Sequence, residues 1–384
     1  MAVLVGIDGG NNTVKTALEG GKTIIIPTIA APYRSYDQGL ELLEVNKRAL
    51  KDSMDVEIIL NYEDNSNKKE LGRFYVGNHA KEMEGVSIKE RTIGKAKAGD
   101  ELLLVCMLAS VAAAVVDEHS CDMKQVHEQI RMVTGLPFLQ YRTGRDEFVS
   151  RLLGKHKIIF RGTHEVEVEI DVKEVHTEIE GLGALDKTIL NTANKNMFSE
   201  EEIIDRTILG IDIGEFTSDV IALVFKDDGD GRIVPEFKQK LCMGIDMGIS
   251  SAKQPIIDLV REKYNTIVDR ADIDTCLKRR YRKGEIDLET GETFSIIGLF
   301  EENLAQLSNI ISVLINNKVK SLSEKGRIKY ALLYGGGVCA LDGRMGELLK
   351  EKIGEVIGGE CIILEDAQII NALGYLEKAK KLYG

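Results

Sequence analysis

The sequence predicts an α/β protein made of two related halves. Short apolar runs with the character of strands alternate along the chain with longer segments of helical periodicity. Residues 4–18 predict a strand, a tight glycine turn and a returning strand, and residues 209–223 repeat that arrangement. The two segments lie about half the chain apart, and this spacing indicates that one structural plan has been duplicated.

Length, composition and charge narrow the class of protein. A chain of 384 residues exceeds what one hydrophobic core usually serves, so two domains or a duplicated domain are expected. Its 43% hydrophobic and 29% charged residues are typical of a folded protein. The net charge of −12 argues against a direct hold on nucleic-acid phosphates or on an anionic membrane. Any link to nucleic acid is therefore expected to need an adaptor.

The cysteines and the most apolar segment favour a cytoplasmic protein. The six cysteines lie far apart without a Cys-x-x-Cys pair, so neither a zinc site nor a disulfide framework is expected. Residues 102–116 are flanked by acidic residues and fall short of the ~20 residues that span a bilayer, so they predict a buried helix. The first residues lack a basic region and enter a strand at once, and no signal peptide is expected.

The remaining elements follow from hydrophobic periodicity. Residues 166–172 alternate between apolar and charged side chains, as a half-solvated antiparallel strand does. Residues 234–248 predict a strand that leads into a glycine turn, and residues 329–334 predict a strand that three glycines stop. Helices are predicted near residues 38–50, 98–118, 143–154, 184–197, 250–264, 297–321 and 366–384.

The two glycine turns have the composition of phosphate loops. Because glycine lacks a Cβ, a glycine turn behind a buried strand lets backbone N–H groups come within hydrogen-bonding reach of phosphate oxygens. Lys15, on the returning strand, is placed to direct its ammonium group toward the phosphates. Two such loops facing each other would clasp a triphosphate. The candidate contacts are Gly9, Gly10, Asn11, Asn12, Thr13 and Lys15 in the first loop, and Gly214 and Thr217 in the second.

An aspartate stands at the end of each buried strand, Asp8 in the first segment and Asp212 in the second. These carboxylates would repel phosphates unless a cation lay between them, and Mg²⁺ is often bound through few carboxylates and phosphate oxygens while it keeps most of its waters. The sequence therefore predicts a Mg²⁺ ion held by Asp8 and Asp212 through water. One Asp-Gly turn alone is better explained as an ordinary hairpin. Two related turns, both preceded by Gly-Ile, favour the nucleotide interpretation.

A third glycine cluster, formed by Gly335, Gly336 and Gly337, ends the predicted strand 329–334 and is expected to enter a helix. A helix start that merely needs room is the plainer explanation, but three consecutive glycines carry a large cost in backbone entropy. We expect the cluster to form the surface on which adenosine and the α-phosphate lie. Gly244, in the glycine turn of residues 234–248, is a further candidate contact.

In this order the motifs resemble those of the actin and Hsp70 ATPase superfamily. IDGGNNTVK is similar to its first phosphate motif, IDIGEFTSD to its second and LLYGGGV to its adenosine motif. Its two connecting motifs have similar counterparts in EIEGLGAL at 178–185 and EDAQIINALGYL at 365–376. Within the superfamily the chain is most similar to the ParM-like actins that segregate bacterial plasmids, and to related proteins of archaea. The resemblance covers essentially the whole chain.

The resemblance implies an actin-like ATPase fold, in which two duplicated RNase H-like domains hold a nucleotide in the cleft between them. Domain I would comprise residues 1–185 and 366–384, and domain II residues 186–365. The implied ligands are ATP, with GTP as the alternative, and Mg²⁺. The implied first partner is a second copy of the chain in a filament.

The resemblance also places a catalytic residue in the first connecting motif, where ParM-like proteins carry Glu. Glu180 is the first candidate to orient the attacking water, and Glu178 is its competitor. Asp8 and Asp212 complete the candidate catalytic set.

Both loops depart from the family pattern. Glu215 and Phe216 replace small or hydroxyl residues in the second loop, so Glu215 is expected to face the nucleoside side or to point outward. Asn11 and Asn12 stand where Gly or Ser is frequent. Binding is expected to survive, because Asn tolerates positive φ and donates through its amide.

Three functions are compatible with the sequence. The first is a filament-forming ATPase that segregates plasmid DNA through a DNA-binding adaptor at a centromere-like site. ATP would favour one conformation, which subunit contacts would then select. The second is a small-molecule kinase of the sugar or acetate type, whose substrate pocket has no evident counterpart outside residues 269–296. The third is a chaperone-type ATPase, the least favoured because the sequence ends soon after the second connecting motif. The basic run at 277–285 is expected to be a solvated face, with a filament contact as the alternative.

Overall fold

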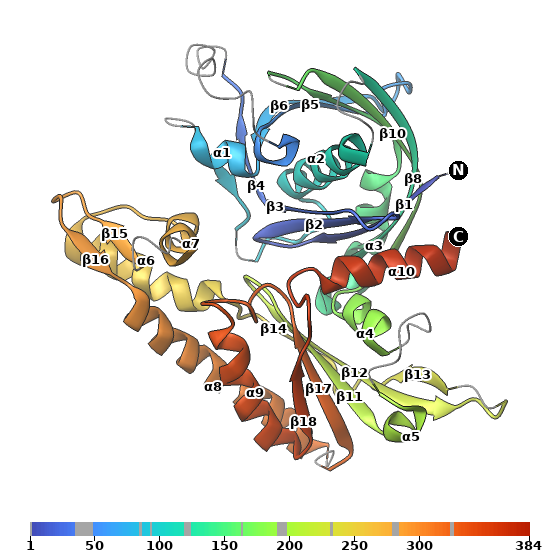
Figure 1. Ribbon diagram of the computed structural model, residues 1–384, viewed down its shortest axis with the longest axis vertical. Helices are drawn as coiled ribbons and strands as arrows, with labels where there is room; N and C mark the ends of the chain where they lie inside the picture. Colours follow the sequence, from blue (N-terminus) through green and yellow to red (C-terminus); the bar gives the residue numbers. More distant parts are fainter. Residues whose placement is uncertain are drawn as a thin grey trace. The chain divides into compact units, whose positions relative to one another are not determined.

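The computed structural model describes residues 2–34, 49–83, 87–92, 94–118, 124–162, 164–189, 198–230, 233–278, 284–322 and 326–384 (Figure 1). The chain divides into one compact unit of Met1–Asn194 with Asn371–Gly384, and a second compact unit of Lys195–Ile370. The predicted boundaries, after residues 185 and 365, lie a few residues before these divisions. Most of the helix predicted near 38–50, and residues 279–283 of the basic run, lie outside the described residues.

Ten strands of the first unit form one sheet, in the order β3-β2-β1-β8-β10-β9-β5-β6-β4-β7. The pairs β1/β8 and β8/β10 are parallel, and the other neighbours are antiparallel. Strand β10 buries every second residue from Val166 to Val172, which confirms the predicted alternation. The strands are β1 (Val3–Gly9), β2 (Thr13–Leu18), β3 (Thr23–Pro27), β4 (Ile29–Pro32), β5 (Met54–Leu60), β6 (Lys69–Val76), β7 (Lys89–Glu90), β8 (Gln125–Leu136), β9 (Gly154–Phe160) and β10 (Val166–Ile179).

The sheet of the second unit repeats the plan of the first. Its order is β13-β12-β11-β17-β18, with β14 paired to β12. Along this path two antiparallel pairs are followed by two parallel pairs, as along β3-β2-β1-β8-β10. The predicted α/β class and the duplication of the strand plan are therefore confirmed. The strands are β11 (Thr207–Ile213), β12 (Ser218–Asp227), β13 (Ile233–Phe237), β14 (Met243–Ile245), β17 (Ile328–Tyr334) and β18 (Glu360–Ile363), besides the separate hairpin β15 (Glu285–Asp287) and β16 (Thr293–Ser295).

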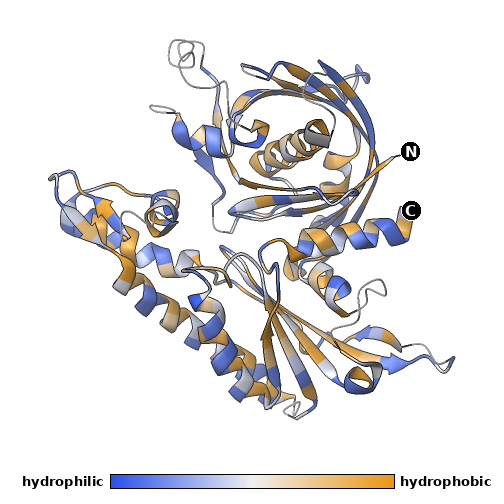
Figure 2. Ribbon diagram, in the orientation of Figure 1, coloured by the Kyte–Doolittle hydropathy of each residue, from blue (hydrophilic) through white to orange (hydrophobic). Residues whose placement is uncertain are grey.

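Helix α2 (Glu101–Glu118) lies at the centre of the first unit, and the large sheet curves around it (Figure 1). Residues 103–115 are all buried, so the helix has no solvated face along this stretch. A helix that is buried on all sides has to be apolar on all sides, and Figure 2 shows α2 coloured as hydrophobic along most of its length. The predicted buried helix at 102–116 is confirmed. No described helix combines the length and the apolar character that a membrane crossing requires.

The helices predicted at 98–118, 143–154, 250–264, 297–321 and 366–384 are present, with ends shifted by a few residues. Of the helix predicted at 184–197, the described part ends at Ile189, and residues 190–197 lie outside the described residues. The short helices at 78–82, 200–203 and 270–278 were not predicted. The prediction of a helix directly after the third glycine cluster is wrong, because α9 begins only at Arg344 and residues 336–343 form turns. Leu341 and Asp342 have φ of 51° and 52°, and left-handed backbone cannot continue a right-handed helix. The helices are α1 (Asn78–Glu82), α3 (Phe138–Leu152), α4 (Leu182–Ile189), α5 (Glu200–Ile203), α6 (Ser250–Tyr264), α7 (Arg270–Lys278), α8 (Ile297–Ser321), α9 (Arg344–Ile357) and α10 (Ile370–Tyr383), with a 3₁₀ turn, η3, at Leu50–Asp52.

The C-terminal helix α10 packs onto the first unit with very little space between the backbones. A Cβ atom added to Gly374 would lie 1.7 Å from the carbonyl oxygen of Gly183 in α4. A Cβ atom added to Gly6 of β1 would lie 2.1 Å from the carbonyl oxygen of Ala372. The backbone N–H of Ala184 donates to Oδ1 of the buried Asn371 at 3.2 Å. Residues of the two connecting motifs therefore meet in this unit.

Gly374→Ala is expected to lower the free energy of unfolding by about 1–3 kcal/mol, because the added methyl group has to push α4 and α10 apart. The measurement is chemical denaturation followed by circular dichroism. Gly298→Ala is the matched control, since Gly298 also lies in a helix but an added Cβ meets no atom within 4 Å. The control is expected to be neutral or slightly stabilising. Equal effects of the two substitutions would contradict the close packing of α10.

Candidate functional site

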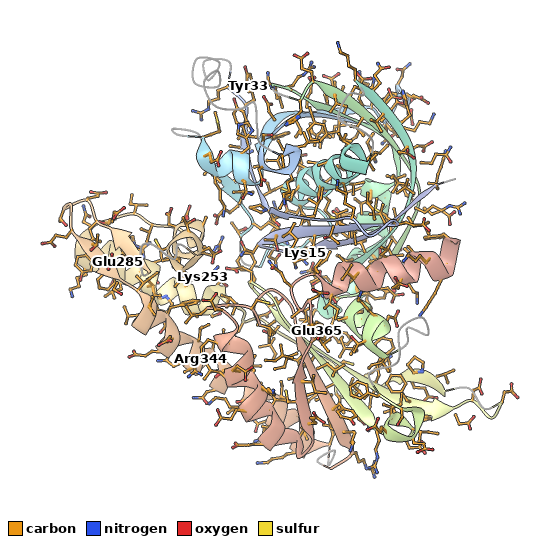
Figure 3. All side chains as sticks on the ribbon, viewed as in Figure 1. Lys15, Tyr33, Lys253, Glu285, Arg344 and Glu365 are labelled. Atoms are coloured by element: carbon orange, nitrogen blue, oxygen red, sulfur yellow. The ribbon has the colours of Figure 1, made fainter. Side chains whose placement is uncertain are left out.

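The first phosphate loop joins β1 to β2 and lies over a buried ion pair. Asp8 and Lys15 are cross-strand partners, and Lys15 Nζ lies 2.7 Å from Asp8 Oδ2. Both side chains are almost completely buried. A Cβ atom added to Gly10 would lie 3.4 Å from Lys15 Nζ and 2.4 Å from the carbonyl oxygen of Thr13, so only glycine fits there. The ammonium of Lys15, a residue that Figure 3 labels, thus pairs with Asp8 close to Gly10 of the loop.

Thr28, between β3 and β4, binds two carbonyl oxygens of the first loop. Its hydroxyl donates to the carbonyl oxygen of Gly10 at 2.8 Å, and its backbone N–H donates to the carbonyl oxygen of Asn12 at 2.8 Å. Two loop carbonyls therefore point toward Thr28, where they cannot repel an anion. Thr28 could not be predicted from the sequence, because no local motif marks a residue that contacts the loop from a neighbouring segment.

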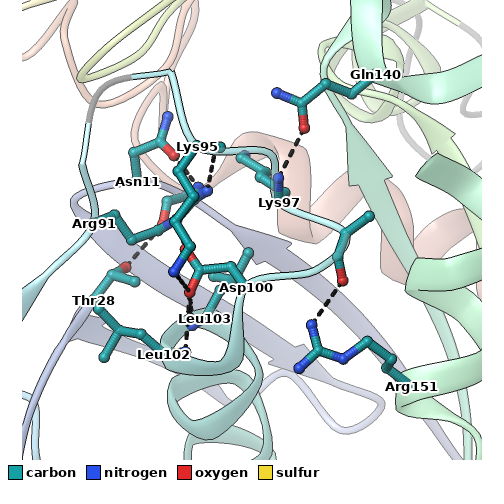
Figure 4. Close-up of polar contacts among 12 residues, drawn as sticks. Asn11, Thr28, Arg91, Lys95, Lys97, Asp100, Leu102, Leu103, Gln140 and Arg151 are labelled. Atoms are coloured by element: carbon teal, nitrogen blue, oxygen red, sulfur yellow. Dashed lines mark hydrogen bonds and ion pairs between the residues drawn. The ribbon is translucent and has the colours of Figure 1, made fainter. Parts of the chain in front are cut away.

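A network of polar side chains holds Asn11 from the other side (Figure 4). The fully buried Arg91 donates through Nη1 to Asn11 Oδ1, through Nε to Asp100 Oδ2 at 2.7 Å and through Nη2 to the carbonyl oxygen of Lys95 at 2.8 Å. Asp100 in turn accepts the backbone N–H of Leu102 at 3.0 Å and so caps the start of α2. Arg91 was also missed from sequence.

Glu180, the first catalytic candidate, lies in a buried cluster of charges. It follows β10, and its carboxylate accepts a hydrogen bond from Lys97 Nζ, whose side chain is only 3% exposed. Burial raises the pKa of Glu180, the ammonium of Lys97 opposes that rise, and the nearby carboxylate of Asp8 adds to it. Glu180 thus shares its surroundings with Asp8 and Lys15 of the first loop. Lys97 is a further residue that the sequence analysis missed.

Glu178, the competitor, has a different environment. Its Oε1 lies 2.9 Å from His176 Nε2 and 3.0 Å from Lys378 Nζ of α10. Burial acts to raise the pKa of Glu178, but the hydrogen bonds from His176 and Lys378 hold that pKa below its ordinary value. These contacts favour a structural role for Glu178 and leave Glu180 as the better candidate.

The second phosphate loop joins β11 to β12 in the second unit. The backbone N–H of Gly214 donates to the carbonyl oxygen of Thr217 at 2.9 Å and closes the turn. The carbonyl oxygens of Gly214 and Glu215 accept the backbone N–H groups of Ile249 at 3.1 Å and of Ser250 at 2.8 Å. The segment that leads into α6 therefore binds the carbonyl oxygens of the second loop, as Thr28 does in the first loop.

Glu215 points into the unit, contrary to the expectation that it faces the nucleoside side or points outward. Its carboxylate pairs with Lys253 Nζ of α6 at 2.9 Å, and the same ammonium lies 2.7 Å from Asp274 Oδ1 of α7. Lys253, labelled in Figure 3, is 2% exposed. Although burial acts to lower it, the two carboxylates raise the pKa of Lys253, so the side chain stays an ammonium. Glu215 is buried because Lys253 neutralises it there.

The third glycine cluster lies against the end of β11. Gly335 has φ of 92°, and a Cβ atom added to it would lie 2.1 Å from Asp212 Oδ1. The backbone N–H of Gly337 donates to the carbonyl oxygen of Ile213 at 2.8 Å. An added Cβ on Gly336 meets nothing within 4 Å. Asp212 and the cluster are thus brought together within the second unit.

Gly244 lies in β14 of the second unit. It pairs with Asp219 between β14 and β12. It also lines a cavity of about 550 Å³ together with Met243, Met247 and residues of α8 such as Leu314. Its role as a nucleotide contact stays a prediction.

The residues that are present fit a magnesium nucleotide. In each loop a Cβ added to a glycine would collide with a backbone carbonyl oxygen, 2.4 Å away at Gly10 and 2.9 Å away at Gly214, and in each loop other groups hold carbonyl oxygens. Within the described ranges, no three His, Cys, Asp or Glu side chains gather as ligands for a metal ion. A Mg²⁺ ion bound through few carboxylates, water and phosphate would not need such a cluster. Asp8 and Asp212 therefore stay the proposed carboxylates.

Comparisons with known proteins connect this geometry to a fold. Residues 6–183 match the family model described as the N-terminal domain of actin-like proteins. A comparison with curated protein sequences finds no match.

Several solved structures are similar over nearly the entire chain. A 15-stranded ParM filament from Clostridium botulinum has a TM-score of 0.74 and 21% identity, with 99% of both chains covered. The archaeal actin homologue Ta0583 in complex with ADP has a TM-score of 0.66 and 16% identity, covering 99% of this chain and 100% of the other. Bacillus thuringiensis ParM with AMPPNP has a TM-score of 0.63 and 17% identity, with 99% of both covered. At these identities the likeness is one of fold.

Lys253→Met is expected to lower the denaturation midpoint strongly, because it leaves Glu215 and Asp274 without their shared cation. Breaking a buried ion pair typically costs about 3–5 kcal/mol. The control is Lys226→Met, which removes a pair with Glu236 whose side chains are 49% and 54% exposed. Exposed pairs contribute little, so the control should unfold like the unmodified protein. Urea denaturation compares the three proteins, and a Lys253→Met midpoint equal to that of the control would refute the buried triad.

Proposed function

Because residues 6–183 carry the N-terminal domain of the actin-like proteins and the whole chain has the actin-like ATPase fold, we propose that it is an ATP-dependent filament protein that moves plasmid DNA. The resemblance to ParM-type actin-like proteins that the motifs indicate is confirmed by this family match and by the similar structures. The activity and the partners of the chain are the parts that are proposed.

The observation that supports hydrolysis most directly is the environment of Glu180. A buried carboxylate next to the first phosphate loop can accept a hydrogen bond from a water molecule and orient it for in-line attack. Burial raises the pKa of Glu180, and Lys97 opposes that rise, since an adjacent ammonium favours the ionised form. Phosphoryl transfer depends chiefly on such positioning and on the neutralisation of charge.

The loops supply the groups that would hold the nucleotide. The proposed phosphate contacts are the backbone N–H groups of Gly9 and Gly10, the hydroxyls of Thr13 and Thr217, and the amides of Asn11 and Asn12. Gly214 shapes the second loop, because its N–H donates to the carbonyl oxygen of Thr217. Gly335, Gly336 and Gly337 would support the nucleoside. Mg²⁺, held through water by Asp8 and Asp212, would neutralise phosphate charge. ATP is the preferred nucleotide in this proposal, with GTP as the alternative.

The filament and its load rest on the relatives. One similar structure is a ParM filament, and others hold ADP or AMPPNP. By analogy, subunits of this chain would assemble in the nucleotide-bound state. The load would be a plasmid in the cytoplasm, attached through a DNA-binding adaptor at a centromere-like site. The net charge of −12 favours such an indirect link.

ATP with Mg²⁺ is expected to cause rapid assembly of the purified protein, which light scattering and pelleting detect. ADP is expected to support less polymer. A protein that stays in the supernatant with ATP and instead releases ADP only when a sugar or acetate is added would favour the kinase alternative.

Glu180→Ala is expected to leave polymer formation intact and to slow phosphate release by roughly 10²–10⁴-fold, the usual contribution of a positioned acid or base. Glu178→Ala is the matched control, because it removes a carboxylate two residues away that pairs with His176 and Lys378. A phosphate-release assay distinguishes them. If only Glu178→Ala slows hydrolysis, the assignment is reversed.

Lys97→Met is expected to move the acidic limb of the ATPase pH profile to higher pH. The active form of Glu180 is the carboxylate. Its pKa is already raised by burial, and Lys97 opposes that rise. Without Lys97 the pKa rises further, so the variant needs a higher pH than the unmodified protein to reach the same fraction of its activity. Lys95→Met is the control, since Lys95 pairs with Asp100. Its acidic limb should stay in place, and an unmoved limb in Lys97→Met would disprove the pairing's role.

A further inference from the structure

We propose that Arg91 is a positioning residue for the phosphates: it locks the side-chain amide of Asn11 so that the N–H donors of that amide face the first phosphate loop's ligand. This inference rests on the proposed nucleotide binding. It assigns a role to a buried cation that binds a residue of the first phosphate loop.

The guanidinium of Arg91 is enclosed by acceptors. Its side chain is 0% exposed, and its donors reach the carboxylate of Asp100, the carbonyl oxygen of Lys95 and the amide oxygen of Asn11. Lys95 and Asp100 follow Arg91 by 4 and 9 residues, whereas Asn11 lies 80 residues away in the sequence. Asn11 is the only one of the three that belongs to the phosphate loop (Figure 4).

The chemistry of the two side chains determines the orientation of the amide. A guanidinium has only donors, whereas an asparagine amide has an acceptor oxygen on one side and two N–H donors on the other. Figure 4 shows the oxygen of Asn11 turned toward Arg91 and the nitrogen on the opposite side. The flipped amide would set donor against donor at a buried group and lose a charge-assisted hydrogen bond. Arg91 therefore selects one of the two orientations.

The selected orientation suits an anion. A phosphate accepts hydrogen bonds, so an amide nitrogen stabilises it and an amide oxygen repels it. Thr28 does the same for the backbone, since it holds the carbonyl oxygens of Gly10 and Asn12. The first loop thus has three of its oxygen atoms drawn onto protein donors before the ligand binds. Such preorganisation lowers the entropy cost of binding.

Arg91 is itself anchored. Asp100 accepts hydrogen bonds from Arg91 and from the backbone N–H of Leu102, and Lys95 Nζ lies 3.1 Å from its other oxygen. Although burial acts to raise it, the bonds from Arg91 and Lys95 hold the pKa of Asp100 below its ordinary value. The carboxylate therefore stays charged. Because Asp100 also caps α2, the guanidinium is tied to the most deeply buried helix of the unit.

A lysine could not replace Arg91 in this role. Its ammonium can pair with Asp100, but it lacks the planar fork that reaches three acceptors at once. The competing explanation is that Arg91 only supports the fold. The two explanations differ in what happens at Asn11.

The first experiment substitutes the far side of the amide. Asn11→Asp keeps an oxygen toward Arg91 and replaces only the donor nitrogen with a charged oxygen. We expect an unchanged or higher melting temperature, because the bond to Arg91 becomes an ion pair, and an ATP affinity lower by at least roughly a hundredfold. Asn11→Ala should lower the affinity by only about tenfold. Fluorescent ATP analogue titration measures affinity, and differential scanning calorimetry measures melting.

The second experiment is a double-mutant cycle of Arg91→Lys with Asn11→Ala, again on ATP affinity. Arg91→Lys alone is expected to weaken binding about tenfold. In the Asn11→Ala background it should weaken binding no further, because the group through which it acts is gone. Arg73→Lys is the control for loss of stability, since Arg73 forks onto Asp55, a buried residue of β5. It should leave the affinity unchanged.

The outcomes separate the two proposals. Tight ATP binding by Asn11→Asp, or an effect of Arg91→Lys that is equally large in both backgrounds, would overturn the role of Arg91 while the nucleotide site stands. If the unmodified protein binds neither ATP nor ADP with Mg²⁺, the proposed function itself fails. If Arg91→Lys lowers melting and leaves affinity unchanged, Arg91 only supports the fold.

Discussion

Buried charges of opposite sign hold both phosphate loops, and much of the geometry around the loops depends on that pairing. An ion that leaves water loses several kcal/mol of hydration, which only a close partner can offset. Asp8 has Lys15, Glu180 has Lys97 and Glu215 has Lys253. The pairs Glu180–Lys97 and Glu215–Lys253 each join a connecting motif or a loop to a distant segment of the same unit. If one member moved away, the other would keep a buried charge without its partner.

The two units share a strand plan and differ in how they support it. In the first unit, side chains from neighbouring segments, Thr28 and Arg91, hold the oxygen atoms of the loop. In the second unit, backbone N–H groups of Ile249 and Ser250 do so, and the acidic residue of the loop is turned inward onto α6. A duplicated topology therefore supplies two loops of similar shape with different chemical surroundings. The candidate that would orient the attacking water, Glu180, lies in the first unit, whereas the second unit contributes Asp212 to the candidate catalytic set.

Local patterns predicted much of the fold and part of the site. Strand alternation at 166–172, the glycine turns and the periodic helices are properties of a few consecutive residues, and the backbone period makes them readable. The position of Lys15 also follows from a local pattern, because it lies opposite Asp8 in a hairpin. Arg91 and Lys97 do not, because they lie 80 and 83 residues from their partners Asn11 and Glu180. The late start of α9 was missed because left-handed residues at 341 and 342 are not marked by glycine.

The sequence by itself determined the α/β class, the duplicated strand–turn–strand segments, the buried helix at 102–116 and the family resemblance. Each of these is encoded in neighbouring residues. Only the tertiary structure decided which charges pair, that Glu215 points inward, that Glu180 and not Glu178 joins the cluster at the first loop, and that Gly374 meets Gly183. The physical reason is that these features depend on residues far apart in the sequence. The free-energy cost of burying a charge, and the space between two backbones, are set by which distant elements the fold brings side by side.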